Sequence, residues 1–84
     1  MNIPTLDKEL NANCIENFEG KALVKVVAGD YEISCLNTWK SEWQVILFNE
    51  VLGTQDYEVD PVFDFELNNL IVRLKASILA GKRF

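Results

Sequence analysis

The side chains in this chain that could do chemistry are mostly carboxylates, and they gather in one segment. Residues 56–66 hold five acids and no base: Asp56, Glu58, Asp60, Asp64 and Glu66. The first three are spaced by two, so an extended chain would place them on one side. This pattern favours a solvated loop that leads into an acid-biased helix start. An acidic docking patch for a basic partner is the alternative interpretation.

Other residue combinations that support catalysis or metal binding are missing from the sequence. The chain has no histidine, which removes the usual general base of a nucleophile and the commonest metal ligand. A calcium loop does not fit residues 56–66, because Pro61 replaces the expected glycine region. Carboxylate pairs could support hydrolysis, but a domain of 84 residues rarely forms a deep cleft. We therefore expect a protein that is not an enzyme and has no cofactor and no metal site.

The two cysteines, Cys14 and Cys35, stand among apolar neighbours. We expect two buried thiols in a reducing compartment, with a disulfide as the less favoured alternative. The sequence shows no apolar run of about 20 residues and no leader with a basic start. We therefore expect a cytoplasmic protein that does not enter a membrane. The net charge of −5 argues against direct nucleic-acid binding.

The N-terminal segment, residues 5–18, is expected to form a helix that Thr5 caps and Gly20 ends. Apolar residues recur along it at steps of four: Leu6, Leu10, Cys14 and Phe18. Three asparagines in this segment are poor helix formers, so packing must hold the helix in place.

The strongest strand signals lie at residues 21–28 and 31–36, with Gly29 and Asp30 forming a hairpin turn between them. Residues 38–52 are ambiguous, because as a helix they would scatter their apolar side chains around the whole circumference. The unbroken apolar run at 45–48 suits a strand buried on both faces, so we predict a strand at 43–48. A weak fourth strand is expected at 57–59.

The last element is expected to be a helix in which Asp60 is the N-cap, Pro61 the first helical residue and Gly81 the end. One apolar stripe should face the sheet: Phe63, Leu67, Leu70, Ile71, Leu74 and Ile78. The basic residues toward the C-terminus complement the helix dipole.

These elements predict a single α+β domain over residues 1–84. We expect two layers: an N-terminal helix and a C-terminal helix packed on one face of a three- to four-stranded antiparallel sheet. A β-hairpin with three helices is the alternative if residues 38–52 are helical.

Two features suggest contacts with partners. The last helix has a second apolar stripe that would form an oligomer interface, or else pack under the first helix: Phe65, Val72, Ala76 and Leu79. Trp39 and Trp43 flank an expected turn, and at least one of them should be core. Trp39 is the better candidate for an exposed partner-binding residue.

Size and composition favour a small non-catalytic protein-binding module. We hypothesise an inhibitor, immunity or antitoxin-like protein, for example phage-encoded, that blocks a partner with a basic surface. A homo-oligomeric structural or assembly subunit of a phage or mobile element, including a homodimer, is the second hypothesis. Nucleic-acid mimicry is the third, and it is disfavoured because a net charge of −5 is low for this length.

Overall fold

The computed structural model describes residues 3, 6–17 and 19–84, and for Asp60 it describes the backbone alone. The expected cap at Thr5 and the apolar residue Phe18 lie outside the described residues. Over the described part of the chain, no helix is long and apolar enough to cross a membrane.

Two helices and five strands make up the fold. In chain order they are α1 (Lys8–Ala12), β1 (Cys14–Glu16), β2 (Ala22–Ala28), β3 (Tyr31–Trp39), β4 (Glu42–Asn49), β5 (Thr54–Phe63) and α2 (Asp64–Leu79). The strands form one antiparallel sheet in which each strand pairs with the next along the chain. The α+β class is confirmed, while the predicted count of three to four strands is too low. The alternative of a hairpin with three helices is wrong.

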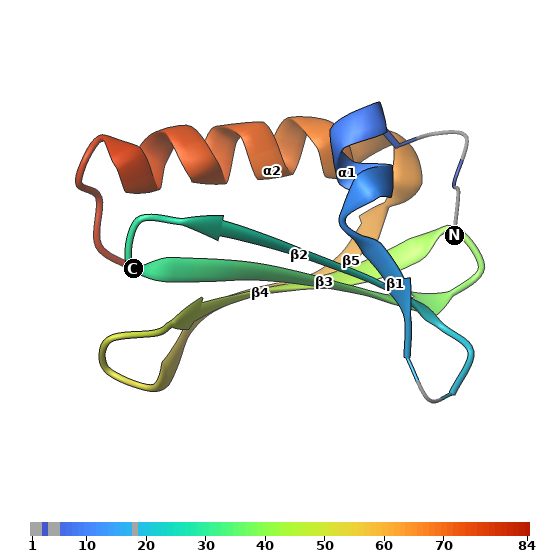
Figure 1. The fold of residues 1–84 in the computed structure, drawn as a ribbon, viewed down its shortest axis with the longest axis horizontal. Helices are drawn as coiled ribbons and strands as arrows, with labels where there is room; N and C mark the ends of the chain where they lie inside the picture. The colour runs from blue at the N-terminus through green and yellow to red at the C-terminus, as the bar shows by residue number, and fades with distance from the viewer. Residues whose placement is uncertain (1–2, 4–5, 18) are drawn as a thin grey trace.

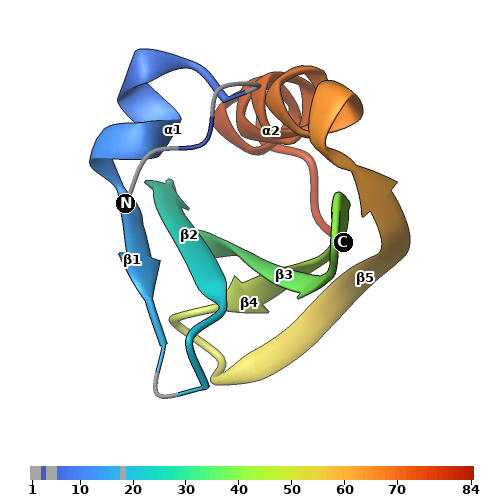
Figure 2. The ribbon, with the colours of Figure 1, turned by 90° about the vertical axis from the view of Figure 1, so that its right-hand side faces the viewer.

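Both helices lie on the same face of the sheet, which makes two layers (Figure 1). The sheet curves around them, with β1 and β5 at its two edges (Figure 2). We call the face that carries the helices the inner face, and the opposite face the outer face.

The central strands follow their sequence pattern. The β2–β3 hairpin turns at Gly29, whose φ of 56° is accessible to glycine with little strain. The predicted strand at 43–48 is confirmed as β4. It is not buried on both faces, however, because Val45 and Leu47 point into the core while Phe48 is exposed. Alternation between an apolar interior and a solvated exterior therefore holds here too.

The N-terminal segment differs from the prediction, because the helix stops at Ala12 and residues 14–16 form β1 against β2. The C-cap of α1 is Asn13, whose side-chain amide donates to the backbone carbonyl of Glu9 at 3.0 Å. The side chain of Asn11 bonds the backbone of Ile3 and Leu6, and that of Asn17 accepts from the backbone amides of Glu19 and Lys21. Such local bonds offer the backbone an alternative to helical pairing.

The start of the last helix also differs from the prediction. Asp60 and Pro61 belong to β5, and α2 begins at Asp64. The register of β5 against β4 shifts between its pairs at Val59 and Val62, so Asp60 and Pro61 form a bulge in an edge strand. A bulge on an edge tolerates the missing amide hydrogen of proline. Phe63 therefore ends the strand and is partly exposed instead of facing the sheet from the helix.

The core lies between the inner face and α2. The predicted buried stripe of α2 is confirmed at Leu67, Ile71, Leu74 and Ile78, with Leu70 packed at its margin. The indole nitrogen of the fully buried Trp43 donates to the carboxylate of Asp64 at the start of α2. This bond ties the helix to the sheet and satisfies the polar end of the indole.

Both cysteines are buried and free, as expected. Cys14 and Cys35 each pair with Val24, from opposite sides, so β2 separates them. Burial raises the pKa of the Cys35 thiol to about 12, which keeps it protonated and unreactive.

Candidate functional site

Neither helix covers the outer face of the sheet (Figure 1). Its side chains are the strand residues that alternate with the buried ones. The pairing of the strands brings them into three rows, each running from one strand to the next: Ile15, Leu23, Leu36 and Gln44; Lys25, Ser34, Ile46 and Glu58; Val27, Glu32, Phe48 and Gln55.

Apolar side chains are spread through all three rows. Ile15 and Val27 are exposed, with 69% of Val27 accessible, and Phe48 is exposed at the far end of β4. Leu36 and Ile46 are half-buried by their neighbours across the strands. In the first row, Ile15, Leu23 and Leu36 face one another on paired strands and form one apolar cluster. In the third row, Glu32 lies between Val27 and Phe48.

Trp39 extends this apolar surface at the end of β3. A register shift after Asn37 makes Trp39 pair with Glu42, which alternates with the core residue Trp43. Trp39 is therefore on the outer side, and 64% of it is exposed. The ammonium group of Lys40 lies 5.3 Å from the centre of its ring. The two tryptophans thus divide as predicted, with one in the core and Trp39 exposed.

Acidic groups surround the apolar residues of the outer face. Among the described strand residues of the outer face, the charged side chains are three acids and one base: Glu32, Glu42, Glu58 and Lys25. Lys25 lies 3.6 Å from Glu32, so its charge is already matched. The side-chain amide nitrogens of Gln44 and Gln55 donate to the two carboxylate oxygens of Glu58, at 2.6 and 3.2 Å. These two bonds hold Glu58 in one orientation.

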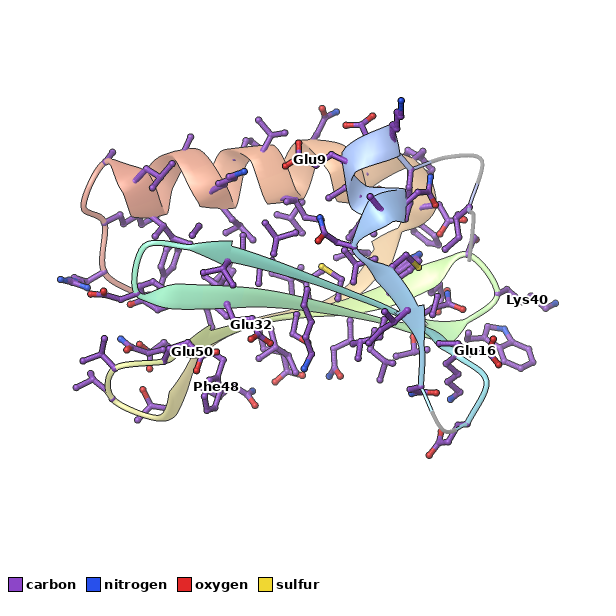
Figure 3. The ribbon with its side chains drawn as sticks, viewed as in Figure 1. Glu9, Glu16, Glu32, Lys40, Phe48 and Glu50 are labelled. Atoms are coloured by element: carbon purple, nitrogen blue, oxygen red, sulfur yellow. The ribbon has the colours of Figure 1, made fainter. Side chains whose placement is uncertain are left out.

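Glu50 adds a second carboxyl group beside Glu32 (Figure 3). The pKa of Glu50 is raised, mainly because its carboxyl group bonds that of Glu32 and also because the two like charges repel. Lys25 opposes this shift. A lysine or arginine of another molecule beside these two carboxyl groups would relieve their mutual repulsion.

The predicted acidic patch is only partly assembled. Asp56 and Glu58 were expected on one side of an extended chain, and this expectation is wrong. A second register shift in β5 lies between Gln55 and Tyr57, so Asp56 is an extra residue that turns toward the inner side. There its carboxylate accepts from Tyr31 at 3.2 Å, from Asn49 at 3.3 Å and from Thr54.

The remaining predicted acids have separate positions. Asp64 is half-buried and accepts from Trp43, whereas Glu66 is exposed on the first turn of α2. The side chain of Asp60 lies outside the described residues. Of the predicted acids, Glu58 is therefore the one that the structure places on the outer face. Sequence reasoning did not select Glu32, although the alternation of residues 31–36 already placed its side chain outward. Nothing local marked Glu50.

A cavity of about 360 Å³ opens at the end of the sheet, between the β2–β3 turn, the β4–β5 turn and the C-terminal residues. Its polar groups already bond one another. Arg83 pairs with Asp30 at 3.1 Å, and the backbone amide of Phe84 donates to the hydroxyl of Tyr31 at 3.3 Å. The bonds to Asp56 lower its pKa, with Thr54 contributing most. We assign this network to fastening the C-terminal residues against the sheet.

The second stripe of α2 is exposed. Phe65, Val72 and Leu79 are 71%, 61% and 66% accessible, and Ala76 is exposed among them. α1 lies beside α2, where Glu9 pairs with Lys75 at 3.7 Å, but it does not cover the stripe. The ring of Phe63 stacks on Phe65 at 5.9 Å between centroids.

Comparisons with protein-family models, with curated proteins and with solved structures gave no match to this chain. Among the described residues, no group of three or more side chains of the metal-ligating types comes together. What the described arrangement offers is surface chemistry: aromatic and aliphatic anchors, with carboxylates around them, on a stiff sheet.

Proposed function

We propose that this protein is a binding module that docks the outer face of its sheet on a basic surface of another protein. The observation that carries the proposal is one sheet face, uncovered by either helix, that combines exposed apolar side chains with an excess of carboxylates. An exposed apolar surface bordered by polar groups is typical of a protein–protein interaction site.

Two kinds of side chain would divide the binding between them. Trp39 and Phe48 supply flat, stiff anchors, and tryptophan is among the residues most enriched at the centre of protein interfaces. Glu32, Glu50 and Glu58 supply negative charge, which steers a basic partner toward the face and fixes its orientation. The bonds from Gln44 and Gln55 hold Glu58 in one orientation before binding, which lowers the entropy lost on docking.

The mode of action that fits such a module is steric. A partner whose basic surface is covered by the outer face cannot offer that surface to a nucleic acid or an acidic substrate. This is how an inhibitor, immunity or antitoxin-like protein would act, and small size with a stable core suits that role.

The test compares two reversals of charge on opposite faces. Tagged wild-type protein is used to capture partners from lysate of the source cells, next to Glu50→Lys on the outer side and Glu66→Lys on α2, both at exposed positions. We expect Glu50→Lys to lose a stoichiometric protein partner that wild type and Glu66→Lys retain. Association with the purified partner should slow steeply as salt rises.

Fluorescence provides a second readout that does not depend on charge. Trp39 is exposed and Trp43 is fully buried, so the emission of Trp39 should lie to the red and shift on binding of the purified partner. The Trp39→Phe variant should show no such shift. Equal capture of the partner by Glu50→Lys and wild type, together with unchanged Trp39 emission, would refute docking through the outer face.

A further inference from the structure

We propose that α2 pairs in antiparallel orientation with α2 of a second copy of this chain, about a two-fold axis that passes beside Val72. The proposal concerns the opposite side of the molecule from the outer face and does not depend on the proposed function. It assigns a specific occupant to the exposed apolar stripe of α2.

The stripe is symmetric about its midpoint. Phe65 precedes Val72 by seven residues and Leu79 follows it by seven. Seven residues make about two helical turns, so all three side chains stay on one side of the helix over a length of about 21 Å. A two-fold axis at Val72 would bring this residue against its own copy and Phe65 against Leu79 of the second copy. Self-complementarity of this kind is what an isologous dimer requires.

The charges of α2 favour the antiparallel orientation. The helix starts with Asp64 and the exposed Glu66, and the exposed Lys82 follows its end. Antiparallel pairing places the acidic first turn of each helix near Lys82 of the other copy, and it also sets the two helix dipoles in opposite directions, which is favourable. Parallel pairing would bring like charges together at both ends.

The stripe is accessible for such a contact. Phe65, Val72 and Leu79 are exposed, whereas the residues of α2 that face the sheet are buried. Phe63 stacks in parallel on Phe65, with 3° between the ring planes, which widens the apolar surface at the start of the helix. Because the helices lie on the inner face, this dimer leaves both outer faces free.

Cysteine cross-linking tests the geometry directly, because both native cysteines are buried and Cys35 stays protonated. The probe is a short bifunctional maleimide. We expect Val72→Cys to give a covalent dimer by itself. Phe65→Cys alone should give none, whereas a mixture of Phe65→Cys with Leu79→Cys should cross-link. Val27→Cys, an equally exposed valine position on the outer face, is the matched control and should stay monomeric.

Sedimentation equilibrium measures the association without a cross-link. Wild type should have the mass of a dimer, and Val72→Asp should weaken self-association at least tenfold, because the pairing would bury an unmatched carboxylate. Circular dichroism checks that Val72→Asp folds. If it does not fold, Leu79→Glu replaces it as the variant that should weaken self-association. A monomeric wild type at about millimolar concentration would overturn the proposal. Strong cross-linking of Phe65→Cys alone would overturn the antiparallel arrangement.

Discussion

The inner and outer faces of the sheet are built from the same strands, yet they differ in almost every physical respect. On β4, Leu47 is fully buried, while the next residue, Phe48, is exposed. Trp43 points into the core and is anchored by Asp64, whereas Trp39 stands in solvent. In β2 and β4, buried side chains thus alternate with side chains that reach the surface.

This difference predicts which substitutions should lower stability and which should not. The inner face and α2 contain the buried side chains that stabilise the fold. The outer face contributes little burial and so can change its side chains at small cost in folding energy. Substitutions on the two faces should therefore affect different measurements.

The largest expected change in the free energy of unfolding comes from a substitution on the inner face. Leu47→Ala should lower the free energy of unfolding by about 2–5 kcal/mol, since it removes buried methyl groups and leaves a cavity. Val27→Ala on the outer face should change it by less than about 0.5 kcal/mol. Denaturant titration followed by circular dichroism measures both. Similar losses in the two variants would mean that the outer face is also buried, by self-association or otherwise.

A smaller effect is expected from the one buried polar residue among the described core positions, Asn49. Its side-chain oxygen accepts from the backbone amides of Val51 and Leu52, and its amide nitrogen donates to Asp56. Asn49→Ala leaves these groups without their partner and should cost about 1–3 kcal/mol. Asn69→Ala, at an exposed position of α2, is the control. An equal effect of both variants would show that the turn does not need this side chain.

The smallest expected effect is a change in the free energy of unfolding with pH. Asp56 on the inner side and Glu50 on the outer side should contribute to it with opposite sign. The pKa of Asp56 is lowered, so its contribution to stability is present above the ordinary aspartate pKa and is lost as pH falls through the folded-state value. The pKa of Glu50 is raised, so its contribution is present at low pH and is lost as pH rises through the folded-state value. Asp56→Asn and Glu50→Gln should each abolish one of these dependences.

The measurement is denaturant unfolding between about pH 2 and 6, a range that spans the ordinary carboxyl pKa values. The difference in the free energy of unfolding between wild type and Asp56→Asn should become smaller as pH falls. The free energy of unfolding of wild type relative to Glu50→Gln should instead decrease as pH rises, because the contribution of Glu50 is present at low pH and is lost as its carboxyl group ionises beside Glu32. A difference that does not vary with pH for either variant would contradict the assigned hydrogen bonds.

The parts of the fold that could be predicted from the sequence are those with a long, regular period. The β2–β3 hairpin alternates over each strand, and the buried residues of α2 repeat at helical spacing. β1 could not be predicted in this way, because three residues are too few to show a period and their pairing depends on β2. The true start of α2 was hidden because Asp60 and Pro61 suit a helix start as well as a bulge.

For the candidate site too, features with a recognisable sequence pattern could be predicted and features that depend on strand pairing could not. Exposure of Trp39 was predicted because a tryptophan beside a turn is a recognisable feature. The joint position of Asp56 and Glu58 was mispredicted because one extra residue in a strand reverses every later side chain. The closeness of Glu32 and Glu50 depends on how β3 and β4 pair and on the turn after β4, which no local pattern encodes.

The bulges of β5 have a further consequence for how this protein behaves at high concentration. A long, flat edge strand invites other chains to add to the sheet and starts fibrous aggregation. β5 is interrupted by two register shifts and by Pro61, which lacks an amide hydrogen, and the opposite edge at β1 is only three residues long. Growth of the sheet beyond five strands is therefore hindered at both edges, which disfavours fibrous aggregation.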